Sequence, residues 1–136
     1  MTIEEAIFSY LSTYAGLVPL ISTKVFPDVV PQSVELPAIV YTFISSDKPR
    51  STVCGHHGFS NDIYQIAIYA KTRAGVIAIK EEVRKALLGT DGAGYHGLMG
   101  TLHIKQCVDV GGLRGGYDKD ADEYYDQTDY QFTYEY

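Results

Sequence analysis

Two stretches of the chain carry apolar residues at the spacing of a helix. The first begins with Thr2-Ile3-Glu4-Glu5, a capping box in which the threonine hydroxyl and the Glu5 carboxylate satisfy backbone N–H groups. We predict an amphipathic helix from there to about residue 15, with the apolar face Ile3, Ala6, Ile7, Tyr10, Leu11 and Tyr14 and with Gly16 at its end. A second helix is predicted over 72–89, where one stripe holds Val76, Ile79, Val83, Ala86 and Leu87.

Four other stretches have the patterns of β-strands. Residues 38–45 and 62–70 are apolar on both sides, so both faces of these strands need cover. Residues 102–110 alternate apolar with polar and stop at Gly111-Gly112, which predicts a half-exposed strand. A terminal strand is predicted directly after Glu123 and runs to the last residue, because from Tyr130 onward Tyr130, Phe132, Tyr134 and Tyr136 alternate with polar residues.

The remaining segments are predicted to connect these elements. Three prolines make 25–37 an extended connector, and 17–22 adds a short turn at most. Glycine-rich loops are expected over 46–60 and 89–100, and a mobile loop over 111–123. The order α-β-β-α-β-β predicts an α+β fold, with a four-stranded mixed or antiparallel sheet and two helices on one face.

Composition limits the class of protein. A chain of 136 residues with 46% hydrophobic and 21% charged residues suits a single soluble domain over 1–136. Its formal charge of -6 argues against a protein that grips nucleic acid, which needs clustered cations. No signal peptide, membrane span or disulfide is expected, so both cysteines should be reduced.

An acidic stretch invites a calcium site. Asp118, Asp120 and Asp122 have the spacing of the first three ligands of an EF-hand loop, and Asp129 falls at its twelfth position. The sixth position is Glu123 where a sharp turn needs glycine, and a strand pattern follows where the motif needs a helix. A solvated acidic loop is the better interpretation, and no cofactor is predicted.

Thiol and imidazole groups offer a second chemistry. Cys54, His56 and His57 lie close in sequence and could bind zinc or assemble a nucleophile with its base, with further ligands among His96, His103 and Cys107. Their spacing matches no known zinc finger. A small cytoplasmic metal-binding or hydrolytic protein is therefore the alternative, while a non-enzymatic protein is the main prediction. The glycine run at 111–116 opens no helix, so it lacks the usual phosphate-binding terminus.

The aromatic residues point to contacts between subunits. The chain has 12 tyrosines and no tryptophan, and they occur on both faces of the predicted strands. Two short helices cannot cover all of them, which favours an oligomer as much as a packed core. The candidate subunit or channel contacts are Tyr41, Phe43, Tyr69, Arg114, Asp118, Asp120, Asp122, Tyr124 and Tyr125.

Several segments, taken in order, carry a family resemblance. They are the short first helix, the arm Val25-Phe26-Pro27-Asp28 to Pro31-Gln32, Leu36-Pro37-Ala38-Ile39-Val40-Tyr41, Ile68-Tyr69-Ala70, Val83-Arg84-Lys85-Ala86-Leu87-Leu88 and Asp129-Tyr130-Gln131-Phe132. In this order and spacing the chain resembles the tail-completion family of long-tailed bacteriophages and prophages, the tail-terminator or tail-to-head joining proteins.

The resemblance implies a structural role in the virion tail, for a protein made in the host cytoplasm. It implies a ring, expected to be a hexamer, that caps the tail tube, ends its polymerisation and offers a surface to the head connector. It implies no catalytic residue. DNA would pass through the ring without specific binding, and acidic residues of 118–123 would help if they faced the channel, because like charge opposes adhesion.

Overall fold

The described part of the chain forms three helices and six strands. A computed structural model describes residues 2–47, 59–89 and 94–135. In chain order the elements are α1 (Ile3–Thr13), α2 (Val18–Ile21), β1 (Val25–Pro27), β2 (Ala38–Asp47), β3 (Phe59–Ala70), α3 (Arg73–Leu88), β4 (Gly97–Met99), β5 (Leu102–Asp118) and β6 (Glu123–Glu135).

The sheet has six strands in the order β1-β2-β3-β6-β5-β4, so the predictions of four strands and of the element order α-β-β-α-β-β were wrong. Only β1 and β2 are parallel, and the other neighbours are antiparallel. The two missed strands are three residues each, too short for alternation to show. β1 lies in the proline-containing segment predicted as a connector, and β4 lies in the segment predicted as a glycine-rich loop.

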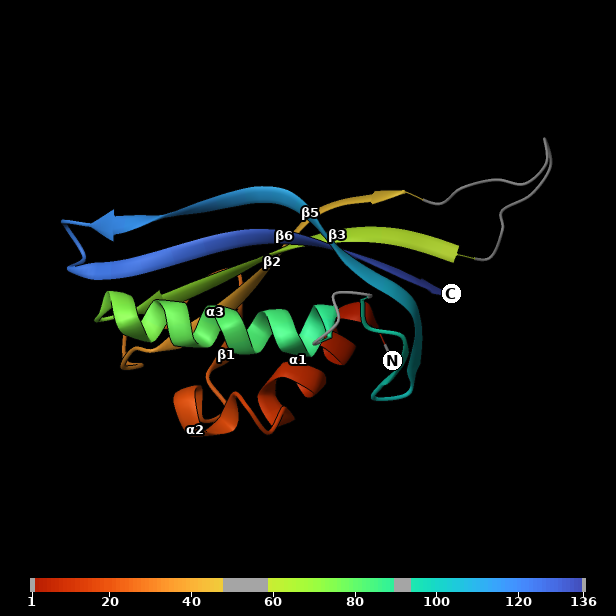
Figure 1. Cartoon of the computed structure of the whole chain (residues 1–136), viewed down its shortest axis with the longest axis horizontal. Helices are drawn as coiled ribbons and strands as arrows, with labels where there is room; N and C mark the ends of the chain where they lie inside the picture. Colours follow the sequence, from red (N-terminus) through yellow and green to blue (C-terminus); the bar gives the residue numbers. More distant parts are fainter. Residues whose placement is uncertain (1, 48–58, 90–93, 136) are drawn as a thin grey trace.

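The largest correction concerns β5 and β6, which form a long hairpin (Figure 1). β5 continues through the predicted mobile loop to Asp118, whereas β6 begins at Glu123, where that loop was predicted to lead into the terminal strand. The glycines do not end β5, because its register with β6 shifts on both sides of Gly111 and the pairing then continues through Gly115 and Gly116. A four-residue turn, 119–122, remains of the predicted loop.

Both main helices are confirmed. Their ends could be predicted because nearby residues determine them. Thr2 and Glu5 form the capping box, and the Thr72 hydroxyl accepts from the Gly75 amide at 3.0 Å. Gly89 ends α3 with a φ of 76°, as predicted, whereas α1 ends at Thr13, before Gly16.

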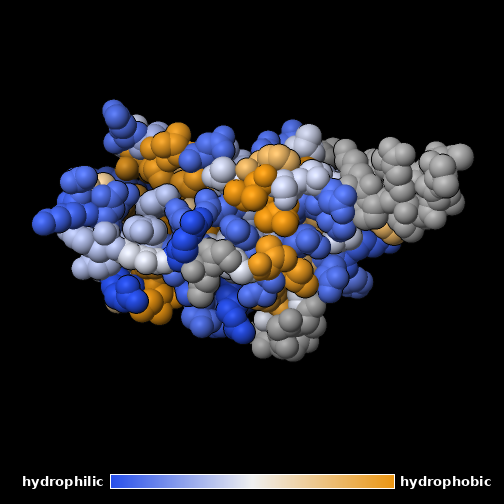
Figure 2. All heavy atoms as spheres, turned by 90° about the horizontal axis from the view of Figure 1, so that it is seen from above, coloured by the Kyte–Doolittle hydropathy of each residue, from blue (hydrophilic) through white to orange (hydrophobic). Residues whose placement is uncertain are grey.

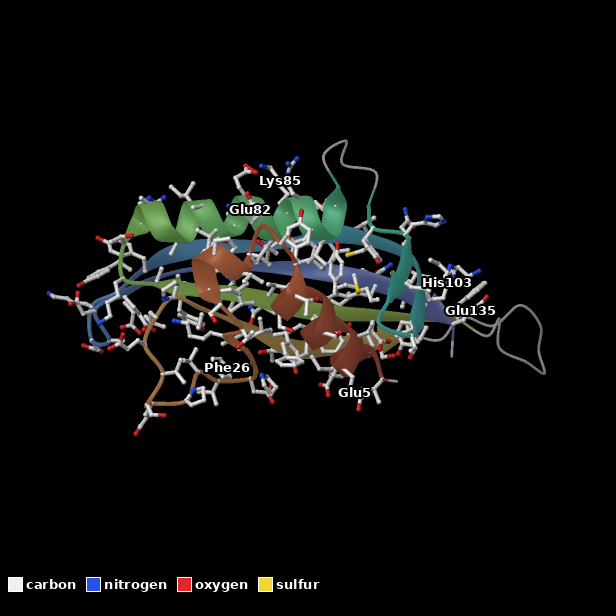
Figure 3. All side chains as sticks on the ribbon, turned by 90° about the horizontal axis from the view of Figure 1, so that it is seen from below. Glu5, Phe26, Glu82, Lys85, His103 and Glu135 are labelled. Carbon is white, nitrogen blue, oxygen red and sulfur yellow. The ribbon has the colours of Figure 1, made fainter. Side chains whose placement is uncertain are left out.

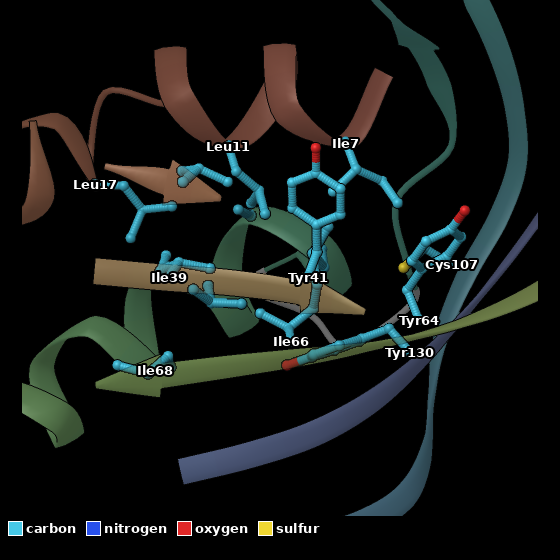
Figure 4. Close-up of a cluster of buried hydrophobic side chains, with 14 of the residues drawn as sticks. Ile7, Leu11, Leu17, Ile39, Tyr41, Tyr64, Ile66, Ile68, Cys107 and Tyr130 are labelled. Atoms are coloured by element: carbon cyan, nitrogen blue, oxygen red, sulfur yellow. The ribbon is translucent and has the colours of Figure 1, made fainter. Parts of the chain in front are cut away.

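The helices cover one face of the sheet, as predicted (Figures 1 and 3). Alternate residues of β3 and β6, including Tyr64, Ile66, Tyr130 and Phe132, meet the apolar sides of α1 and α3 in the core cluster. Figure 4 shows Tyr41 and Tyr64 among Ile7, Leu11 and other buried side chains. Each such side chain contributes roughly 1.5–3 kcal/mol when it leaves water.

The opposite side of the sheet has no helix over it among the described residues, and we call it the open face (Figure 1). Strand alternation puts the following residues of β3 and β6 there: Asn61, Ile63, Gln65, Ala67, Tyr69, Tyr125, Gln127, Asp129, Gln131 and Thr133. Side-chain hydrogen bonds cross it from Gln65 to Gln127 at 3.3 Å and from Thr133 to Asn61 at 2.7 Å. Figure 2 shows hydrophobic and hydrophilic residues interspersed on this side, a mixture that suits contact with another molecule.

Candidate assembly surfaces

A hollow of about 700 Å³ lies on the open face beside the β5–β6 hairpin, and we call it the hairpin hollow. Cross-strand register creates it. Tyr69 of β3 pairs with Tyr125 of β6, which pairs with Gly116 of β5, so the Tyr125 ring can lie over a position without a side chain. The lining residues are Gln65, Tyr69, Arg114, Tyr117, Asp118, Lys119, Tyr125 and Gln127.

A second hollow, of about 390 Å³, adjoins the first, because Tyr69 and Asp118 line both. The arm after β1 forms its other wall, with apolar residues from Val29 to Leu36. This arm covers Val40, which is buried although its strand lies near the edge of the sheet. Val29 itself stays exposed, so the wall offers apolar surface to a partner.

The hairpin tip, residues 117–123, is an ordered acidic turn. The Asp118 carboxylate accepts hydrogen bonds from the amides of Asp120, at 3.1 Å, and Ala121, at 3.3 Å. The Tyr117 hydroxyl donates to Asp122, and this bond is the main cause that raises the pKa of Tyr117. Burial, followed by the Asp118 charge, raises the pKa of Glu123. The carboxylates therefore shape a turn, as an Asx turn does.

The structure separates the nine predicted contact residues. Tyr69, Arg114, Asp118 and Tyr125 meet at the hairpin hollow. The others lie apart from it: Asp120 and Asp122 are in the exposed turn, Tyr124 packs its ring 4.8 Å from that of Tyr117, Phe43 is 49% exposed near the edge of β2, and Tyr41 is in the core.

Tyr41 is the residue least suited to a contact. It is 7% exposed, and burial raises the pKa of its hydroxyl. Its neighbour along β2, Phe43, still reaches solvent while its ring stands edge-on to Tyr64, with 5.6 Å between the centroids. A partner could therefore touch Phe43 far more readily than Tyr41.

Sequence reasoning missed a cluster of hydroxyl groups that donate hydrogen bonds to the buried carboxylate of Asp62. Its Oδ1 accepts from the hydroxyls of Ser46 and Ser60, both at 2.6 Å, and its Oδ2 accepts from the Tyr134 hydroxyl at 2.7 Å. Asp62 is 5% exposed. The available signal was an aspartate on the core side of β3, two residues before Tyr64. The cluster joins β2, β3 and β6 at one end of the sheet.

The alternative built on Cys54, His56 and His57 falls outside the described residues. Within the part of the chain that the structure describes, no group of three or more His, Cys, Asp or Glu side chains could hold a metal ion. Cys107 is fully buried, and burial raises the pKa of its thiol, which opposes nucleophilic use. His96 and His103 form only a pair, with ring centroids 6.4 Å apart.

No helix among the described residues is long and apolar enough to span a bilayer.

Comparison with solved structures gives the fold independent support. A chain from the structure described as "Virion of native gene transfer agent (GTA) particle" aligns with a TM-score of 0.69 and 18% identity, covering 98% of this chain and 95% of that chain. No curated protein matches the sequence. The family described as Tail completion protein gp17 matches residues 5–129, from α1 into β6. The chain therefore belongs to the tail completion protein gp17 family, a family of structural proteins of the bacteriophage tail.

Proposed function

We propose that this protein caps the finished tail tube as a ring, ends tube polymerisation and joins the tail to the head connector. The family match over residues 5–129 carries this proposal, because it takes in the helices and most of the sheet. Its partners are then other copies of itself, expected as a hexamer, the tail-tube protein and the head-connector protein. No step of this function needs a catalytic residue or a cofactor.

The layered fold supports a ring with an outer and an inner side. Copies in a closed ring meet through two different surfaces, and all copies turn the same face toward the axis. Since the helices occupy one face, the open face is the natural inner wall. The hairpin hollow and the exposed arm would then lie near one mouth of the channel.

The chemistry of the open face suits the passage of DNA. β3 and β6 place no lysine or arginine on it, and half of their ten positions there are Asn, Gln or Thr. Lys and Arg supply most nonspecific affinity for phosphate, so a wall whose cations are confined to Arg114 and Lys119 at the hairpin hollow should let DNA slide. The surface that keeps DNA from adhering is then the sheet, and not the acidic turn to which the sequence analysis assigned this role.

The test is polymerisation of purified tail-tube protein with and without this protein. Tubes should stop growing when it is added, and electron microscopy should show a ring at one end. A variant of the hairpin hollow, Arg114→Glu, should bind tube ends or connector more weakly than Lys85→Glu, which reverses an exposed charge on α3. Unchanged tube growth with bare tube ends would contradict the proposal.

A further inference from the structure

Helix α3 carries a basic stripe on its exposed side. Arg73, Ile77, Lys80 and Arg84 follow one another at intervals of four, three and four residues, which keeps them within a narrow arc of the helix. Ile77 is 51% exposed, and Arg73 and Arg84 are exposed as well. We call these four residues the α3 stripe.

Two of the three cationic side chains of the α3 stripe form no ion pair within the described residues. Lys80 pairs with Asp126 at 3.3 Å, but no ion pair is found for Arg73 or Arg84 among the described residues. Arg73, Ile77 and Lys80 also line a hollow of about 230 Å³ beside Gly115 of β5. Of the two acidic residues of α3, Glu82 lies away from the stripe and pairs with Lys85 at 3.6 Å (Figure 3), whereas Glu81 borders the stripe, three residues before Arg84.

The hairpin tip has the complementary chemistry. It presents the carboxylates of Asp118, Asp120, Asp122 and Glu123 with a single cation, Lys119. Tyr117, at its base, is 46% exposed and offers an aromatic side beside those charges. The hydrogen bonds within the turn hold it in one shape, so little conformational entropy would be lost on docking.

Both surfaces lie at the same end of the molecule. The β5–β6 turn projects beyond the start of α3, where Arg73 lies (Figure 1). Copies related by rotation about one axis stay at the same height, so the tip of one copy can meet the stripe of the next. One contact then joins two different surfaces, as a closed ring requires.

We propose that the hairpin tip of one copy docks on the α3 stripe of the next copy. Asp120 and its neighbouring carboxylates face Arg73 and Arg84, while Tyr117 covers Ile77. This inference rests on the proposed ring and names the contact that closes it. The hairpin tip then forms the contact between subunits, and the open face forms the channel wall.

Charge reversal tests the contact, with assembly read by native mass measurement and by electron microscopy on tube ends. Arg73→Glu and Asp120→Lys should each weaken assembly about tenfold at low salt, because each sets like charges together. The combined variant should recover most of this loss, since it restores opposite charges across the contact. Arg73→Glu with Glu82→Lys has the same net charge but changes a position away from the stripe, so it should stay weak.

The outcomes separate this contact from the ring itself. Rings that form equally well with either single reversal, or a combined variant no better than the singles, would show a ring closed by other surfaces. Absence of wild-type rings both in solution and on tube ends would contradict the proposed function, and this contact with it. Salt-dependent binding of a duplex DNA probe that is lost in Arg73→Glu would assign the stripe to nucleic acid instead.

Discussion

The Tyr134 hydroxyl donates a hydrogen bond to Oδ2 of Asp62 at 2.7 Å, so the end of β6 is tied to the start of β3. Asp62 is nearly buried and receives its other hydrogen bonds from Ser46 and Ser60. A buried carboxylate that loses a donor keeps its desolvation cost without compensation. The bond is therefore more than a surface contact, and it explains how the chain end is held.

Tyr134→Phe should lower the free energy of unfolding by about 1.5–3 kcal/mol, the usual worth of a hydrogen bond to a charged group. Urea unfolding followed by circular dichroism would measure it. Tyr117→Phe is the matched control, because it also removes a hydroxyl bonded to an aspartate, but in the exposed turn. Its effect should be about 0.5 kcal/mol or less, and equal effects of the two variants would contradict a special role for Asp62.

Alkaline pH should unfold the protein through its tyrosines. Burial, with hydrogen bonding to Asp62, raises the pKa of Tyr134 to about 12 from its ordinary value of 10.0. Burial also raises the pKa values of Tyr10, Tyr64 and Tyr130. Because the folded state holds these protons more tightly, their contribution to stability is complete below pH 10 and is lost as pH rises toward the folded-state values.

The measurement is an absorbance titration of phenolate beside circular dichroism. Exposed tyrosines should ionise first, while the buried group should ionise together with loss of structure. Ionisation of all tyrosines in a single step near pH 10, with the fold intact, would show that the core tyrosines are accessible to water.

Glycine positions in the β4–β5 region should differ sharply in tolerance. Gly94 has a φ of 96°, and a Cβ there would overlap the backbone carbonyl oxygen of Cys107. Gly111 has nearly the same φ, 97°, but a Cβ there would meet nothing within 4 Å. Gly111→Ala should cost about 1–2 kcal/mol of backbone strain.

Gly94→Ala should cost at least about 2 kcal/mol more than Gly111→Ala, because a backbone atom cannot move aside as a flexible side chain can. Urea unfolding of both variants provides the comparison. Similar losses would mean that the segment around Gly94 shifts freely and does not pack closely on β5.

Elements with local signals could be predicted from sequence, and elements defined by their neighbours could not. The helix caps at Thr2 and Thr72 act within one turn, so both helices were found. β1 and β4 exist because longer strands lie beside them, and three residues carry no readable period. The Gly-rich half of β5 looked like a loop, since glycine has no strand preference until a partner strand supplies the hydrogen bonds.

The candidate surfaces were predictable only residue by residue. Tyrosines and Arg114 could be picked out by type, but register alone brings Tyr69, Tyr125 and Arg114 to one hollow. The same holds for Asp62, whose partners come from three strands. The sequence thus showed which side chains could make contacts, but it did not show which of them lie close together in the fold.

Adding a cation to the open face should make the ring adhere to DNA. Gln131 lies on this face in the middle of β6, where alternation separates it from the core, and Gln131→Lys places one ammonium there in every copy. If this face lines the channel, assembled rings should gain affinity for duplex DNA that falls with salt, at a slope of about -0.9 for each phosphate contacted. Fluorescence anisotropy over a range of salt concentrations would measure it. Glu81→Lys, which adds positive charge on exposed α3, should leave DNA binding near the wild-type level. Equal gains in the two variants would reflect net charge alone, and no gain from Gln131→Lys in intact rings would place the open face away from the DNA path.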